Sequence, residues 1–239
     1  MQDNTLERII PDQLGQDTFD RITLQLHTER YQFATRHARP GLILDIACGT
    51  GYGAYQILQS DKFRDSHIRA VDIAPETIEY ARKRYAHPRI DFICADALNY
   101  SDTSLYDSIV SLETIEHLYD PKSFIARLYQ LMNKEGVLII SAPVTPSTDG
   151  NPHHFSDFTA RGFKKLLTEA GFTIIDEHLQ KQPYSLSGLF FPKNKRLSQT
   201  RRHLVKYYLQ HPAIFFTRIR SLIVDGLKNK YLTLALRKN

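Results

Sequence analysis

Short apolar runs alternate with longer amphipathic segments through the middle of the chain. Runs rich in branched aliphatic residues, the signature of β-strands, lie at 42–47, 68–73, 90–94, 108–112 and 137–141. Between them, residues 75–86 and 121–133 place apolar side chains at the three- and four-residue spacing of a helix. Strands that alternate with helices predict an α/β fold, with a parallel sheet covered by helices on both faces.

Two further helices are predicted outside this alternating region. Residues 17–38 carry apolar positions at helical spacing, and Pro40 and Gly41 end the pattern. A helix over 160–170 follows Thr159, whose side chain is a candidate N-cap.

The last two apolar runs set the topology of the end of the chain. Runs at 172–178 and 231–236 predict an antiparallel hairpin that closes the sheet, so residues 183–230 form an insertion rather than a tail. Apolar residues at helical spacing among many cations predict two basic amphipathic helices in this insertion. The expected division is an N-terminal helical cap at 1–40, a core at 41–182, the insertion (a lid) at 183–230 and a final strand at 231–239.

Composition narrows the class of protein. The chain has 239 residues, of which 42% are hydrophobic, enough for a sizeable core. Two cysteines, Cys48 and Cys94, cannot frame a disulfide-stapled secreted fold. Neither an N-terminal apolar signal segment nor a run of bilayer-spanning length is present, so we expect a cytoplasmic protein.

The positive charge is concentrated at the end of the chain. Residues 193–239 hold twelve Lys and Arg against one acid, Asp225, a balance of +11. Residues 1–192 hold 19 basic and 25 acidic residues, a balance of −6. The basic segment is either the solvated face of packed helices or a surface for an anionic partner. An anionic small-molecule acceptor, RNA, and peripheral membrane contact through 193–230 all stay open.

A glycine-rich turn follows the first strand, in the sequence LDIACGTGYG at 44–53. Glycines at a strand-to-helix turn let a ligand approach the backbone. Acidic residues lie in or directly after the first four strands: Asp45, Asp72, Asp96 and Glu113. Because ligands of open α/β sheets bind at the carboxyl ends of the strands, these acids should cluster there. They would repel the pyrophosphate of a dinucleotide such as NAD and suit a cationic ligand with ribose hydroxyls and an amine.

This combination resembles the class I S-adenosylmethionine-dependent methyltransferases over roughly residues 20–180. The resemblance implies a Rossmann-like seven-stranded sheet with a terminal antiparallel hairpin. It also implies that Asp72 holds the ribose hydroxyls and that Asp96 meets the adenine amine. The segment HTERYQFA at 27–34 resembles the leading helix of a bacterial subgroup, so Arg30 or Tyr31 would reach the methionine carboxylate. The cofactor-binding residues implied are Arg30, Tyr31, Asp45, Ala47, Gly49, Gly51, Asp72, Ile73, Asp96, Ala97, Leu112 and Glu113.

A second motif, Glu-x-x-Glu-His, follows the fourth strand. Glu113, Glu116 and His117 have the spacing that places three side chains on one face of a helical turn. His154, in the loop after the fifth strand, opens on the same edge of the sheet. Carboxylates and imidazoles together can bind Mg²⁺, Mn²⁺, Zn²⁺ or Fe²⁺.

The motif resembles two metal-dependent branches of this superfamily, the ubiquinone-pathway O-methyltransferases and the small-RNA 2′-O-methyltransferases. The resemblance implies Glu113, Glu116, His117 and His154 as metal ligands, and Glu116, His117 and His154 as catalytic residues. A metal would bind the acceptor hydroxyl and lower its pKa. Many small-molecule methyltransferases carry Glu-His here without a metal, and then His117 or His154 would act as general base.

We interpret the chain as a methyltransferase that O-methylates a small metabolite or a sugar hydroxyl. RNA 2′-O-methylation is one alternative, which the basic insertion favours. A catalytically inactive methyltransferase-like binding module is another, against which the intact Asp45, Gly49 and Asp72 argue. The sequence fixes neither the acceptor nor the oligomeric state, and a homodimer is compatible with it.

Overall fold

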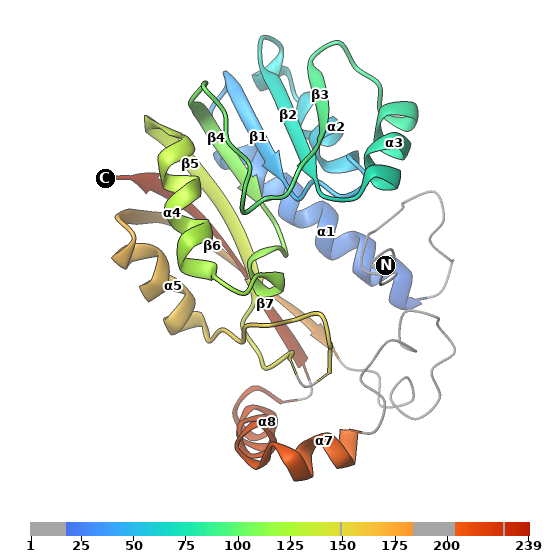
Figure 1. The fold of residues 1–239 in the computed structure, drawn as a ribbon, viewed down its shortest axis with the longest axis vertical. Coiled ribbons are helices and arrows are strands. Elements are labelled where there is room, and N and C mark those ends of the chain that lie inside the picture. The colour runs from blue at the N-terminus through green and yellow to red at the C-terminus, as the bar shows by residue number, and fades with distance from the viewer. Residues whose placement is uncertain (1–17, 149, 184–203, 227) are drawn as a thin grey trace.

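The structure, a computed structural model, describes residues 18–148, 150–183, 204–226 and 228–239. Its strands are β1 (Leu42–Ile46), β2 (His67–Asp72), β3 (Ile90–Cys94), β4 (Tyr106–Ser111), β5 (Met132–Pro143), β6 (Phe172–Pro183) and β7 (Lys228–Lys238). They form one sheet in the order β3-β2-β1-β4-β5-β7-β6 (Figure 1). The first five strands pair in parallel, and β7 runs antiparallel to both β5 and β6. The predicted Rossmann-like sheet with a closing hairpin is confirmed.

Helices cover the sheet and extend beyond it. They are α1 (Thr18–His37), α2 (Tyr52–Leu58), α3 (Pro75–Arg84), α4 (Pro121–Leu131), α5 (Ala160–Glu169), α7 (Leu204–Gln210) and α8 (Pro212–Asp225), with 3-10 turns η3 (Asp61–Phe63) and η4 (Ile115–His117). The predicted N-cap of α5 is confirmed, since Thr159 Oγ1 accepts a hydrogen bond from the N–H of Gly162 at 3.0 Å. Among the helices that the structure describes, none combines the length and the apolar character needed to cross a bilayer.

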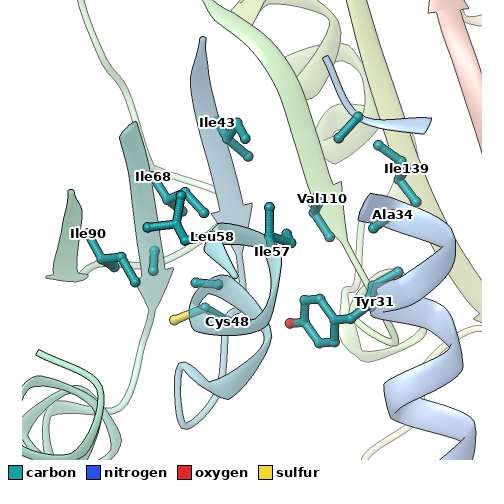
Figure 2. Packing of buried hydrophobic residues seen from close by; sticks show 14 of the residues in the cluster. Tyr31, Ala34, Ile43, Cys48, Ile57, Leu58, Ile68, Ile90, Val110 and Ile139 are labelled. Atoms are coloured by element: carbon teal, nitrogen blue, oxygen red, sulfur yellow. The ribbon is translucent and has the colours of Figure 1, made fainter. Parts of the chain in front are cut away.

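Side-chain alternation along the strands builds two hydrophobic cores, one on each face of the sheet. Ile43 faces the core formed with α1, α2 and α3, and its neighbour Leu44 faces the core formed with α4 and α5. Figure 2 shows the first core, in which Tyr31 and Ala34 of α1 lie beside Val110 of β4. Burial on both faces is why the strands are continuous apolar runs in the sequence.

The last strands are longer than the apolar runs predict. The ladder between β6 and β7 continues to the pair Pro183–Lys228, past the polar positions at 180–182. Strand β5 begins at Met132, inside the helix predicted at 121–133, because Met132 pairs with Tyr106 at the start of β4.

The helices α7 and α8 confirm that helices lie between the two hairpin strands. The domain boundaries assigned from the sequence stay predictions. Parts of the predicted N-terminal cap and of the basic insertion, residues 1–17 and 184–203, lie outside the described residues.

Candidate functional site

The glycine-rich turn between β1 and α2 is held by the end of β2. The N–H of Gly49 donates to Asp72 Oδ2 at 3.0 Å, and the N–H of Ala74 donates to Asp72 Oδ1 at 3.0 Å. Gly51 adopts φ +81°, and a Cβ there would lie 2.5 Å from Phe92 Cε1. The turn therefore requires glycine at Gly51 both for its backbone conformation and for space.

Two non-glycine residues of the predicted site adopt left-handed backbone conformations. Ala47 has φ +61° and Glu113 has φ +51°. Each such conformation costs roughly 1–2 kcal/mol in a residue with a Cβ. Backbone strain of this kind concentrates at functional sites, where the surrounding structure enforces it. Ser141 supplies that support for Glu113: its Oγ accepts from the Glu113 N–H at 3.0 Å and donates to Oε1 at 2.6 Å.

Asp45 is buried beneath the glycine-rich turn with Tyr31 as its neighbour. The Tyr31 hydroxyl donates to Asp45 Oδ2 at 3.3 Å. Burial raises the pKa of the Asp45 carboxyl to about 7, although the Tyr31 hydrogen bond opposes the shift, and the negative charge of Asp72 adds to it. Within the part of the chain that the structure describes, this carboxyl group therefore has no cation paired with it.

Tyr31 also packs against the start of α2. A Cβ at Gly53 would lie 1.8 Å from Tyr31 Cζ, so glycine is needed for this close approach. The Tyr52 ring meets the Tyr31 ring edge to face, with centroids 5.4 Å apart. Among the described residues, the buried Tyr52 hydroxyl has no hydrogen-bond partner. Sequence reasoning missed Tyr52, although its position inside the glycine-rich turn was a usable signal.

Arg30 is a buried cation with incomplete pairing. It is 2% exposed, its Nη2 lies 3.8 Å from Glu113 Oε2, and its guanidinium carbon lies 4.6 Å from the centroid of the Tyr231 ring. Its Nε and Nη1 atoms are buried without hydrogen-bond partners among the described residues. Since burying unpaired polar atoms is costly, this position suits an anionic ligand group. The contact with Tyr231 could not be read from the sequence, because the two residues are distant along the chain.

The other predicted cofactor residues lie at the same carboxyl edge of the sheet. The Ala95 N–H donates to the Asp72 carbonyl at 3.0 Å and joins the ends of β2 and β3. Asp96 Oδ1 accepts from the Leu98 N–H at 3.0 Å. Ile73 is 59% exposed beside Asp72, and so offers an apolar surface to a ligand. Ala97 is half-buried, and Leu112 is buried just before Glu113.

A second cluster unites Glu116, His117 and His154. Each residue offers one potential ligand atom, and these atoms lie within 4.8 Å of one another. The two imidazole rings meet edge to face, with centroids 4.7 Å apart. The loop that carries His154 is fixed to η4, because the N–H of Phe155 donates to the Glu116 carbonyl at 2.8 Å.

Glu113 does not join this cluster in the described structure. The helical turn expected over Glu113–His117 is shorter than its spacing suggested, since η4 spans Ile115–His117. The left-handed conformation of Glu113 turns the chain before η4 begins. Its carboxylate instead contacts Ser141 and Arg30. Glu113 thus belongs with Arg30, Tyr31, Asp45, Tyr52 and Asp72, which together form the first cluster.

Both histidines form a hydrogen bond through Nδ1. A carbonyl oxygen only accepts, so His117 Nδ1 donates to the His153 carbonyl at 3.1 Å. His154 Nδ1 and Ser147 Oγ form a hydrogen bond of 2.8 Å, in which the tautomer of His154 sets which atom donates. With its proton on Nδ1, the neutral His117 ring has an unprotonated Nε2. Burial, with the neighbouring His117 and then His153, lowers the pKa of His154 to about 3.

Comparison with known proteins identifies relatives of the chain. The family described as a methyltransferase domain matches residues 44–140. A malonyl-[acyl-carrier protein] O-methyltransferase of Anoxybacillus flavithermus is 33% identical over 190 residues, which cover 74% of this chain and 67% of that protein. A protein of the same name from Acetivibrio thermocellus is 37% identical over 127 residues, which cover 53% of this chain and 44% of that protein. The chain thus spans about two thirds of the length of the first relative and less than half of the length of the second.

A solved structure shares the fold. The N-methyltransferase NodS of Bradyrhizobium japonicum, in complex with S-adenosyl-L-homocysteine, has a TM-score of 0.62 at 17% identity. The match covers 98% of this chain and 94% of NodS. At this identity the likeness shows a common fold, and the acceptor is a separate question.

The raised pKa of Asp45 predicts a pH-dependent cost to folding. Because the folded pKa lies above the ordinary value of 3.8, the folded state binds more protons than the unfolded state, and stability falls as pH rises from about 4 to 7. Asp45→Asn removes this ionisation. At pH 8 it should raise the free energy of unfolding of the ligand-free protein by roughly 2–4 kcal/mol, with little gain at pH 4.

Denaturant titration at the two pH values measures this difference. The control is Asp65→Asn, at an exposed position, which should leave stability unchanged at both. A gain from Asp45→Asn that is equal at pH 4 and pH 8 would show that ionisation of Asp45 carries no cost.

Proposed function

The chain belongs to the class I S-adenosylmethionine-dependent methyltransferases, and on this premise we propose that it methylates a hydroxyl oxygen of a small-molecule acceptor. The acceptor would bind beside Glu116, His117 and His154. The observation that carries this proposal is the convergence of two imidazoles and one carboxylate in that cluster, each with a potential ligand atom within 4.8 Å of the others.

The first cluster fits the cofactor chemically. S-adenosylmethionine supplies a methyl group on a positively charged sulfur, together with an amino-acid end, a ribose and an adenine. The unpaired nitrogens of Arg30 suit the amino-acid carboxylate, and Asp45 suits the nearby positive charge. Asp72 and Asp96 would accept from the ribose hydroxyls and the adenine amine. Tyr52 and Glu113 would complete the wall around the amino-acid end.

The acceptor cluster favours a hydroxyl over a carboxylate. A hydroxyl can donate its proton to His117 Nε2, His154 Nε2 or the Glu116 carboxylate. A carboxylate acceptor has no proton to donate and would lie against the negative charge of buried Glu116. The names of the relatives give a malonyl group as acceptor, and its free carboxylate is such an anion. Methylation of a malonyl thioester is therefore the second candidate, favoured by similarity and opposed by this geometry.

A divalent cation fits the same three residues. Glu116, His117 and His154 each offer one potential ligand atom, and two imidazoles with one carboxylate are a ligand set typical of Zn²⁺, Fe²⁺ or Mn²⁺. A bound metal would lower the pKa of a hydroxyl that coordinates it. The hydrogen bonds of His117 with the His153 carbonyl and of His154 with Ser147 Oγ would hold the two imidazole rings in the orientation that a metal ligand needs. Without a metal, His154 or His117 would take the hydroxyl proton as general base.

Methyl transfer from labelled S-adenosylmethionine would test the acceptor class. We expect label to enter hydroxylated small metabolites or sugars, and not RNA bearing free 2′-hydroxyls or a malonyl group on a carrier protein. Label in RNA would favour the alternative function that the basic insertion suggests. If calorimetry detects no binding of S-adenosylmethionine, the result would favour the catalytically inactive binding module.

Asp72→Asn should weaken cofactor binding by about 10- to 100-fold, because a charged acceptor of ribose hydroxyls is replaced by a neutral one. Calorimetric titration with S-adenosylmethionine measures the loss. Asp91→Asn, at an exposed position of β3, is the matched control and should keep wild-type affinity. Equal affinities for all three proteins would remove Asp72 from the binding site.

Glu116→Gln and His154→Asn should lower turnover at least 100-fold on the acceptor that the screen identifies, while cofactor affinity stays within twofold. Metal analysis and assays after chelation separate the two versions of the mechanism. Activity that is lost on chelation and restored by one divalent ion supports the metal, whereas full activity in metal-free protein leaves general-base catalysis. Wild-type turnover in both variants would exclude the cluster from catalysis.

A further inference from the structure

The helices α7 and α8 expose an unusual amount of apolar surface. The side chains concerned are Val205 at 75%, Leu209 at 79%, Phe216 at 68%, Ile223 at 80% and Val224 at 71% exposure. Single exposed apolar residues are ordinary, but a group of five on two consecutive short helices is not. An exposed apolar surface of this kind marks a site of contact with a membrane or with another protein.

The exposed residues follow helical spacing. Val205 and Leu209 lie four residues apart on α7, and Phe216, Ile219 and Ile223 lie three and four residues apart on α8. Both helices lie beyond the end of the sheet, away from α4 and α5 (Figure 1). Their own packing uses a different set of side chains: the rings of Tyr208 and Phe215 meet with centroids 5.4 Å apart. The apolar face is therefore not the seam between the two helices.

Cations accompany this apolar face. Lys206 and Arg220 are exposed on α7 and α8, and Lys228 is exposed where β7 begins. Residues 204–230 hold five Lys and Arg against one acid, a balance of +4. An apolar face within a cationic segment is complementary to a lipid bilayer with anionic headgroups, which offers a negative surface over an apolar interior. A second copy of the same face would bring like charges together.

We propose that α7 and α8 form a membrane-interface element that inserts its apolar face between anionic lipids and holds their headgroups with its cations. The element is short and lies in the interface without spanning the bilayer. Arg218 ties it to the acceptor side of the protein, since its Nη2 donates to the Pro146 carbonyl at 2.7 Å, next to Ser147. Docking would then bring the His154 loop near the membrane surface, a consequence that rests on the proposed function.

Co-sedimentation with lipid vesicles tests the element without cofactor or acceptor, so its outcome is independent of catalysis. We expect the full chain to bind phosphatidylglycerol vesicles, not phosphatidylcholine vesicles, and to bind less as salt increases. Leu209→Ser/Ile223→Ser should weaken binding at least tenfold by removing two inserted side chains. Lys206→Gln/Arg220→Gln should weaken it about 25-fold, since each cation near an anionic surface contributes about fivefold.

Matched controls lie on other faces of the molecule. Leu105→Ser/Ile175→Ser removes two apolar side chains that are 50% and 40% exposed, and Lys122→Gln/Lys134→Gln removes two exposed cations. Both controls should bind vesicles as the wild type does. Absence of vesicle binding, or equal losses in the controls, would overturn the proposal. A third outcome is a protein that does not bind vesicles but forms a dimer, which Leu209→Ser/Ile223→Ser dissociates. That result would assign the apolar face to a second copy of the chain and would also overturn the proposal.

Discussion

Buried charge with too few partners is the constraint around which the site is built. Arg30 and Asp45 are almost completely buried, yet among the described residues two nitrogens of Arg30 have no hydrogen-bond partner and Asp45 has no paired cation. Burying such groups costs free energy that the rest of the fold has to supply. The two hydrophobic cores on either face of the sheet provide it, and α1 belongs to one of them while carrying Arg30. A ligand with an anionic end and an adjacent positive charge would complete the pairing, so binding relieves a strain that folding created.

The fold could be predicted from the sequence because the strands are buried on both faces. Continuous apolar runs then mark each strand, and their alternation with helices leaves few topologies for a parallel sheet. The ends of the strands could not be predicted, since they depend on a partner strand and not on local composition. The polar positions at 180–182 extend β6 only because residues 229–231 pair with them. Likewise Met132 belongs to a strand, although its segment reads as helix, because Tyr106 lies opposite.

The acids of the site were predictable for a related reason, since parallel strands present their carboxyl ends at one edge. Their partners were not. Ser141 supports the left-handed Glu113 from the neighbouring strand β5, and Tyr231 meets Arg30 from the last strand. No sequence spacing encodes such contacts. The helical spacing expected for Glu113 was not found, because Glu113 itself has a left-handed backbone conformation and η4 begins only at Ile115. The Glu113 side chain therefore does not share a helix face with Glu116. A motif spacing thus predicts shared chemistry only where the backbone conformation is regular.

The groups that would accept a proton and the groups that would attract an anion lie in different parts of the molecule. The cluster of Glu116, His117 and His154 consists of two imidazoles and one carboxylate, so it can receive a proton but has no permanent positive charge of its own to hold an anion. Cations lie instead on α7 and α8, at Lys206, Arg218 and Arg220, and Arg218 attaches α8 to the loop beside His154. Positive charge at that distance attracts an anionic acceptor or surface without lowering the proton affinity of the imidazoles. A cation placed against the imidazoles to bind the acceptor would oppose protonation of the base. The distance between the cations and the imidazoles therefore allows the protein to attract an anion and to accept a proton.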